Sequence, residues 1–170
     1  MKYNYFYLDT NVLINAFFYE HQKYQKQGIS RTFNDPAACA NILNVLTKNR
    51  QKFNKKLLPV LFVADVSVVR FISLLQNIGV NKGIVIEKVK SFLQEYQIVC
   101  CTTTILKKVV ETAKYKGNDI EDLCQAQIAI ENDCLRIITM NDKDFGYIDL
   151  DIINPRKFKE NLFIKEYNTR

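Results

Sequence analysis

Apolar residues follow two patterns that alternate from one end of the chain to the other. Short continuous apolar runs, which are typical of buried strands, lie at residues 3–8, 60–64, 98–101, 136–140 and 152–153. Between them, apolar residues recur every three or four positions, as in amphipathic helices, over segments that begin near residues 11, 36, 67, 84, 103 and 119. This alternation predicts an α/β fold with a mainly parallel sheet of about five strands and helices on both of its faces.

The size and composition of the chain limit what it can be. Its 170 residues, 48% of them hydrophobic, predict a single domain over residues 1–170 with a substantial core. No apolar run reaches the ~18 residues that cross a membrane, and the N-terminus lacks a signal-peptide layout, so we expect a cytoplasmic protein with no membrane partner. The five cysteines include no C-x-x-C pair, which argues against a zinc site or a disulfide framework. The single histidine, His21, lies in a polar run and is expected at the surface.

Acidic residues gather in one segment of an otherwise basic chain. Residues 118–151 hold 9 of the 18 acidic residues but only 2 of the 24 basic ones. The remainder therefore carries 22 basic and 9 acidic residues. A basic body suits a polyanionic partner, and a carboxylate patch suits a divalent cation. Lysines that only keep a small protein soluble explain the same charge distribution.

A carboxylate also stands directly after the first predicted strand. Asp9 follows the apolar run at residues 3–8, and Thr10 comes next. Ligands of open α/β sheets bind at the carboxyl ends of the strands, so this position favours a functional role for Asp9. The competing interpretation is that Asp9 or Thr10 only caps the helix that begins near residue 11.

The acidic segment opens with a helix-start pattern. Asn118 is expected to be the N-cap, with Glu121 at the third helical position, which is the spacing of a capping box. Asp119 and Asp122 are three residues apart and share a face of the helix. Capping and helix-dipole preferences explain Asp119 and Glu121, but they explain Asp122 less easily.

Three carboxylates thus lie where a parallel sheet can bring them together. Asp9 ends the first strand, Asp122 is one turn into a helix, and Asp144 lies just past the strand at residues 136–140. Clustered carboxylates repel one another unless a cation or protons offset the charge, so convergence of the three predicts a Mg²⁺ or Mn²⁺ site. A cation held in this way, with open coordination positions, can activate water and stabilise the leaving oxygen of a phosphodiester.

Three motifs make the chain resemble the PIN-domain nucleases, and most of all their toxin-type (VapC-like) bacterial branch. They are YLDTNVL at residues 7–13, DIEDLCQA at residues 119–126 and ITMNDKDF at residues 138–145. The motifs stand in the family's order, and the resemblance covers nearly the whole chain. It implies a three-layer α/β/α sandwich, metal-dependent cleavage of RNA, inhibition by an antitoxin protein and a frequent homodimeric state.

The resemblance also assigns roles to individual residues. It implies that Asp9, Asp122 and Asp144 are the catalytic, metal-binding carboxylates. The supporting polar residues would be Asn11, Thr139, Asn141 and Asp119.

Two positions depart from the family pattern. Family members commonly carry a glutamate three residues beyond a Ser or Thr on the helix after the second strand, and that spacing from Ser67 leads to Arg70. An arginine cannot bind the metal, but it can hold a substrate phosphate or pair with Asp122. Asp65 is either a replacement carboxylate or a helix N-cap, and Asn141 stands where the family often has aspartate. Weaker metal affinity is the expected consequence.

Three functions remain open at this point. The first is a PIN-type endoribonuclease that uses metal-activated water, as the toxin of a toxin–antitoxin pair. The second is a non-catalytic RNA-binding or antitoxin-binding module with a degraded acidic site, which Arg70 and Asn141 motivate. The third is a phosphotransfer domain of haloacid-dehalogenase or receiver type, because both use an aspartate at a strand end; Asp9-Thr10-Asn11 lacks the second aspartate of the phosphatase motif.

Overall fold

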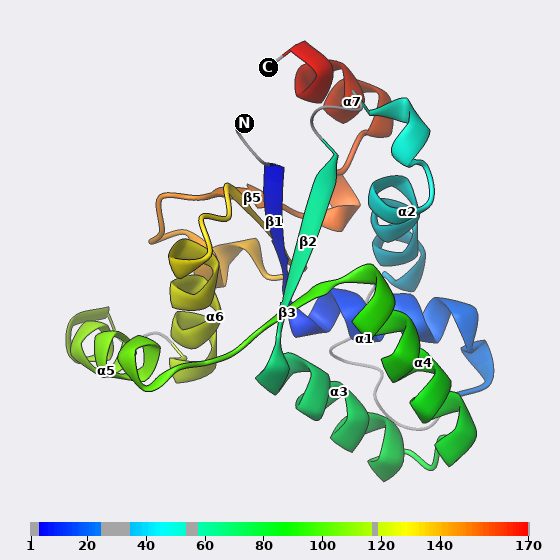
Figure 1. Ribbon diagram of the computed structural model, residues 1–170, viewed down its shortest axis with the longest axis horizontal. Helices are drawn as coiled ribbons and strands as arrows, with labels where there is room; N and C mark the ends of the chain where they lie inside the picture. The colour runs from blue at the N-terminus through cyan, green and yellow to red at the C-terminus, as the bar shows by residue number, and fades with distance from the viewer. Residues whose placement is uncertain (1–3, 25–34, 54–57, 117–118, 170) are drawn as a thin grey trace.

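Five parallel strands form one sheet in the computed structural model, which describes residues 4–24, 35–53, 58–116 and 119–169 (Figure 1). The strand order is β3-β2-β1-β4-β5. In chain order the strands are β1 (Asn4–Leu8), β2 (Pro59–Ala64), β3 (Gln97–Val99), β4 (Arg136–Ile138) and β5 (Asp151–Ile153). The central strand β1 pairs with β2 on one side and β4 on the other, with Tyr7 opposite Phe62 and Ile137.

Helices cover both faces of this sheet, as Figure 1 shows. One layer contains α1 (Thr10–Glu20), α2 (Pro36–Thr47), α3 (Asp65–Asn77), α4 (Lys82–Glu95) and α7 (Glu160–Thr169). The other contains α5 (Thr103–Lys116) and α6 (Ile120–Glu131). Short 3₁₀ helices include η1 (Gln22–Tyr24), η2 (Arg50–Lys52), η3 (Asp142–Phe145) and η4 (Pro155–Lys157). The prediction of an α/β/α sandwich with a parallel sheet of about five strands is therefore confirmed.

Alternation along the strands builds a separate core on each face of the sheet. On β1, Phe6 and Leu8 are fully buried in the core beneath α1 to α4 and α7. The intervening residue, Tyr7, is fully buried in the core beneath α5 and α6. Full burial of one such side chain contributes roughly 1.5–3 kcal/mol to the free energy of unfolding. The two cores hold β1 in the middle of the molecule and fix the position of Asp9 at its end.

Three predicted helix starts differ from the structure, one of them in α4, which begins at Lys82 instead of Ile84. The helix expected to begin at Ser67 begins two residues earlier, at Asp65. Ser67 instead lies buried in the first turn, where its hydroxyl accepts a 2.8 Å hydrogen bond from Thr10 and links α3 to α1. Asn118, the expected N-cap of α6, lies outside the described residues. The N-cap is Asp119, whose carboxylate accepts a hydrogen bond from the backbone N–H of Glu121.

The remaining compositional expectations concern cysteine, histidine and the membrane. All five cysteines lie within the described residues and are free thiols, with Cys39 and Cys134 buried. His21 is only partly exposed, since its ring lies 4.5 Å from that of Phe17 at the end of α1, and it does not line the cleft described below. No helix in the described ranges combines the length and the apolar character that a membrane crossing requires.

Candidate functional site

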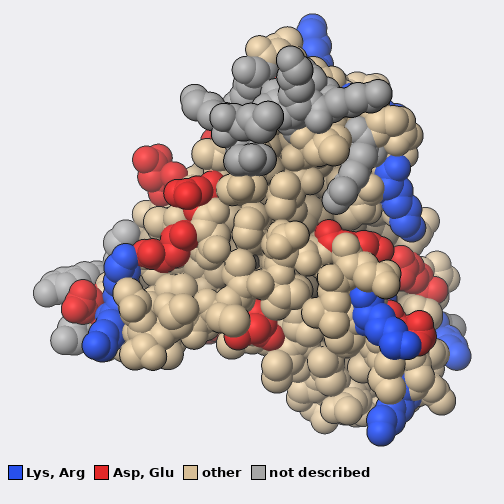
Figure 2. All heavy atoms as spheres, in the orientation of Figure 1, with Lys and Arg blue, Asp and Glu red and all other residues tan. Residues whose placement is uncertain are grey.

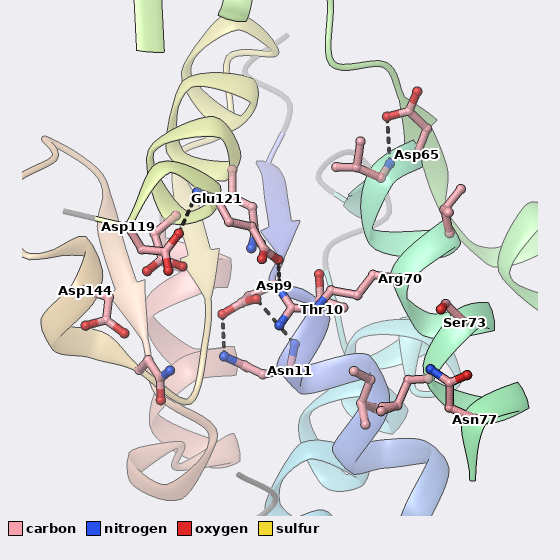
Figure 3. A pocket seen from close by; sticks show the side chains of 17 residues that line it. Asp9, Thr10, Asn11, Asp65, Arg70, Ser73, Asn77, Asp119, Glu121 and Asp144 are labelled. Atoms are coloured by element: carbon pink, nitrogen blue, oxygen red, sulfur yellow. Dashed lines mark hydrogen bonds and ion pairs between the residues drawn. The ribbon is translucent and has the colours of Figure 1, made fainter. Parts of the chain in front are cut away.

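The carboxyl ends of β1 and β4 lie side by side at the point where the chain changes direction in the sheet. After β1 the chain runs outwards to β2 and β3, and it reaches the other side of β1 only at β4. Ligands of open α/β sheets bind at such a switch point. A cleft of about 890 Å³ lies there, between the start of α1, one side of α3, the first turn of α6 and the segment after β4 (Figure 3).

Asp9 caps α1 and also lines the cleft. Its side chain caps α1 by accepting a 3.3 Å hydrogen bond from the backbone N–H of Asn11, and its 4% exposed carboxyl group also lines the cleft. The hydroxyl of Thr139 donates a second hydrogen bond, with 2.6 Å between the oxygens. Burial raises the pKa of Asp9, and the hydrogen bonds from Thr139 and Asn11 oppose this rise. The carboxylate is held in one orientation, at an electrostatic cost that a nearby cation would offset.

Asn11 and Thr139 connect the first turn of α1 to the segment after β4. The side-chain oxygen of Asn11 accepts a 3.1 Å hydrogen bond from the backbone N–H of Met140, and its amide donates to Asp9 and Thr139. The buried hydroxyl of Thr139 also accepts a 3.0 Å hydrogen bond from the backbone N–H of Asn141. The Asn141 side chain remains exposed at the rim of the cleft. These bonds keep Asp9 and the segment after β4 at a constant separation.

Asp122 and Asp144 approach Asp9 from two further elements. Asp122 lies in the first turn of α6 and Asp144 in η3, and both line the cleft. Burial raises the pKa of Asp122 to about 7, and the negative charges of Asp9 and Asp144 add to the rise. The structure therefore brings the three predicted carboxylates into one cleft, where they repel one another.

The cleft offers the oxygen ligands that a hard divalent cation prefers, although the carboxylates are not closed around one point. Among the residues that the structure describes, no group of three or more His, Cys, Asp or Glu side chains is arranged to hold a metal ion. Gln125 is buried in the wall of the cleft and lowers the pKa of Asp9, and its side-chain oxygen has no hydrogen-bond partner among the described residues. Carboxylate and amide oxygens suit Mg²⁺ and Mn²⁺. The donor types fit such an ion, and Asp122 and Asp144 would have to move towards Asp9 to bind it.

The other two carboxylates predicted for the site, Asp119 and Asp65, accept hydrogen bonds from backbone N–H groups. Asp119 lines the cleft but uses its carboxylate to cap α6, with 2.8 Å between its oxygen and the backbone nitrogen of Glu121. Asp65 is the first residue of α3, and its carboxylate accepts a 3.2 Å hydrogen bond from the backbone N–H of Cys101. Figure 3 shows the Asp65 carboxylate at the edge of the cleft, directed away from Asp9. Asp65 thus joins α3 to the segment after β3. The alternative that it is the N-cap of α3 is wrong, since that position is Ala64; its role as a replacement carboxylate stays a prediction, and it lines the cleft.

Arg70 reaches into the cleft from α3 and forms an ion pair with Glu121 of α6 (Figure 3). The alternative that it pairs with Asp122 is wrong. The side chains of Arg70 and Glu121 are 57% and 41% exposed, so water reaches both members of the pair.

Glu121 and Gln125 are polar residues of the cleft that were not selected from the sequence as site residues. Glu121 was explained by capping preferences alone, yet its side chain points across the cleft to Arg70. Gln125 belongs to one of the three motifs but was given no role of its own, yet it is 2% exposed, lines the cleft and lowers the pKa of Asp9. The available signal was helical spacing, because Gln125 lies three and four residues after Asp122 and Glu121 and so shares their face of α6.

Comparison with solved structures identifies the architecture. The structure of FitAB bound to an IR36 DNA fragment matches with a TM-score of 0.61 and 14% sequence identity, over 91% of this chain and 97% of that one. VapBC2 from Rickettsia felis, bound to a DNA fragment from its promoter, matches with a TM-score of 0.60 and 19% identity, over 88% and 98%. FitAcB from Neisseria gonorrhoeae matches with a TM-score of 0.57 and 18% identity, over 90% and 99%.

These similarities confirm the expected PIN-type fold over most of the chain. No family model and no curated protein sequence matches it. The likeness is therefore one of three-dimensional arrangement, and a function has to be argued from the cleft itself.

Proposed function

We propose that the protein is a metal-dependent endoribonuclease of the PIN type and the toxin of a toxin–antitoxin pair. The observation that carries the proposal is the convergence of Asp9, Asp122 and Asp144 on one cleft, where burial and mutual repulsion raise the pKa of Asp122 to about 7. Such repulsion is costly to a protein unless a ligand offsets it, and the ligand that suits three carboxylates is a divalent cation.

In this proposal Asp9, Asp122 and Asp144 hold Mg²⁺ or Mn²⁺. A cation with open coordination positions activates water and stabilises the leaving oxygen of a phosphodiester. Asn11 and Thr139 orient the Asp9 carboxylate through their hydrogen bonds. Together with the cap hydrogen bond from the backbone N–H of Asn11, they tie Asp9 to both sides of the switch point.

RNA and an antitoxin are the proposed partners, and a homodimer is the proposed assembly. The chain's net charge of +6 favours a polyanionic substrate. Figure 2 shows basic side chains over α4 and α5, on either side of an acidic patch where the α5–α6 pair meets α3. The antitoxin is supported by the shared fold, since one similar structure is a toxin–antitoxin complex from Klebsiella pneumoniae (TM-score 0.53, 15% identity, 88% and 96% coverage).

A non-catalytic RNA-binding or antitoxin-binding module is the second candidate, and one observation favours it. Arg70 and Glu121 span the cleft in an ion pair at a position where the family commonly has a metal-binding glutamate. The phosphotransfer function finds less support, since the part of the chain that the structure describes places no lysine in the cleft to assist an aspartyl phosphate.

The test is cleavage of a labelled RNA pool in Mg²⁺, Mn²⁺ or EDTA by wild type, Asp122→Asn and Asp149→Asn. Asp149 is exposed and lies outside the cleft, so it controls for the loss of one negative charge. Metal-dependent cleavage by wild type and Asp149→Asn, absent from Asp122→Asn, supports the proposal. Equal cleavage by all three proteins reveals a contaminating ribonuclease, and RNA binding without cleavage favours the non-catalytic module.

A further inference from the structure

Arg70 is the only lysine or arginine among the described residues that line the cleft. It comes from α3, whose neighbouring cleft residues Ser73 and Asn77 are uncharged. The opposite wall is the first turn of α6, which supplies Asp119, Glu121 and Asp122. A polyanion that enters the cleft therefore meets three carboxylates on the α6 side and, on the α3 side, one guanidinium group with the carboxylate of Asp65 at the edge.

The ion pair between Arg70 and Glu121 is built so that it can open. More than half of the Arg70 side chain and about two fifths of the Glu121 side chain are exposed, and exposed ion pairs contribute little to the stability of a protein. Opening the pair does not unfold α6, because Asp119 caps that helix through the backbone N–H of Glu121. A phosphate can accept two parallel hydrogen bonds from a guanidinium group, and it competes well with a solvated carboxylate.

We propose that Arg70 binds a backbone phosphate of single-stranded RNA in exchange for Glu121, so that Glu121 acts as a built-in competitor that restricts entry to the cleft. The identity of the polyanion rests on the proposed ribonuclease function, whereas the exchange rests on the contacts around Arg70. Arg70 sets substrate affinity, and Glu121 lowers that affinity without touching the RNA. Weakly bound anions leave the ion pair closed, and a polynucleotide with many phosphates opens it.

The exchange is tested by RNA binding in EDTA, where metal-dependent cleavage cannot occur. The probe is a short fluorescein-labelled single-stranded RNA, whose affinity is measured by fluorescence anisotropy over a range of salt concentrations and whose integrity is checked on a gel. The proteins are wild type, Arg70→Gln, Glu121→Gln and the double variant. Asp119→Asn is the matched control, because it removes one negative charge from the same wall while asparagine preserves the helix cap.

The expected pattern is a coupling between the two residues. Glu121→Gln tightens binding about two- to fivefold, which corresponds to the loss of one exposed ion pair, and it does so more than Asp119→Asn. Arg70→Gln weakens binding and reduces the slope of log affinity against log salt by about 1. In the Arg70→Gln background, Glu121→Gln increases the affinity for RNA no more than Asp119→Asn does. Circular dichroism of each variant confirms that the fold is retained.

Two results would overturn the inference. One is an equal gain from Glu121→Gln and Asp119→Asn in both backgrounds, which means that only the total charge of the cleft matters. The other is an absence of RNA binding in wild type and Glu121→Gln alike, which also removes RNA as the substrate. If the coupling is found but no protein cleaves RNA in Mg²⁺ or Mn²⁺, the ribonuclease function fails while the phosphate exchange at Arg70 stands.

Discussion

Replacing Asp122 by asparagine should stabilise the metal-free protein at pH 8. Burial, together with the charges of Asp9 and Asp144, raises the pKa of Asp122 to about 7, so at pH 8 the carboxylate is ionised in an environment that disfavours its charge. Asparagine has nearly the same shape and no charge. The variant therefore keeps the packing of α6 and removes the repulsion in the cleft.

The size of the effect follows from the pKa difference between the folded and unfolded chain. A rise from the ordinary aspartate pKa to about 7 corresponds to a destabilisation of the ionised folded state by roughly 4 kcal/mol when solvent screening is ignored. Asp122 is only partly buried, so solvent screening reduces this to about 1–2 kcal/mol, or a shift in Tm of about 3–8 °C for a chain of this length.

The sign of the pH dependence follows from which state binds the proton more tightly. The folded state does, because its pKa is the higher one. The stabilisation is therefore complete below the unfolded-state pKa, near 4, and is lost as the pH rises through 7. Wild type should become less stable between pH 5 and pH 8, and Asp122→Asn should lose most of this dependence.

Urea denaturation in EDTA at pH 5 and pH 8 measures this difference, with Asp149→Asn as the charge-matched control outside the cleft. Wild type and the control should weaken together on going to pH 8, whereas Asp122→Asn should not. An Asp122→Asn protein that is less stable than wild type at pH 8, or that keeps the wild-type pH dependence, would refute the reasoning. Excess Mg²⁺ at pH 8 should stabilise wild type more than the variant, because only wild type carries the full set of proposed ligands.

Three other substitutions test the surroundings of the site. Asp144→Asn removes one source of repulsion from Asp122, so the loss of stability with rising pH should be smaller and should end at a lower pH in urea titrations; an unchanged profile would mean that Asp144 lies too far from Asp122 to affect its pKa. Thr139→Val removes the hydroxyl that donates to Asp9 and accepts from the backbone N–H of Asn141, and it should cost about 1–3 kcal/mol in the same assay. Phe71→Ala leaves a cavity at a fully buried site between α1, α3 and α4. It should lower the free energy of unfolding by about 3–5 kcal/mol, and a decrease below about 1 kcal/mol would mean that the surrounding side chains repack into the cavity.

The order of secondary structure could be predicted from the sequence, and so could the presence of Asp9, Asp122 and Asp144 in one cleft. Strands and helices follow local periodicity, and a parallel α/β topology places every strand's carboxyl end at one edge. Asp9 and Asp144 were identified because each follows a strand, and Asp122 because capping preferences did not account for it. These inferences require only the identities of residues that are close together along the chain.

Helix boundaries and the roles of individual polar groups were less predictable. Serine often occurs at helix starts, which is why α3 was expected to begin at Ser67. In the structure the hydroxyl of Ser67 accepts a hydrogen bond from Thr10, and α3 begins at Asp65. Whether Asp65 would bind a ligand or hold backbone depended on where the backbone of Cys101 lies, which no local pattern encodes.

By itself, then, the sequence determined the alternation of elements, the parallel sheet and the carboxylates at its edge, because periodicity, capping and strand ends are properties of short segments. Only the tertiary structure decided that Thr139 bonds Asp9 across 130 residues of chain and that Gln125 is buried against the same carboxylate. It alone decided that Arg70 pairs with Glu121. Partners of this kind are selected by the packing of α1, α3 and α6 around one strand, and the raised pKa of Asp122 depends on that packing because desolvation and charge repulsion act through space.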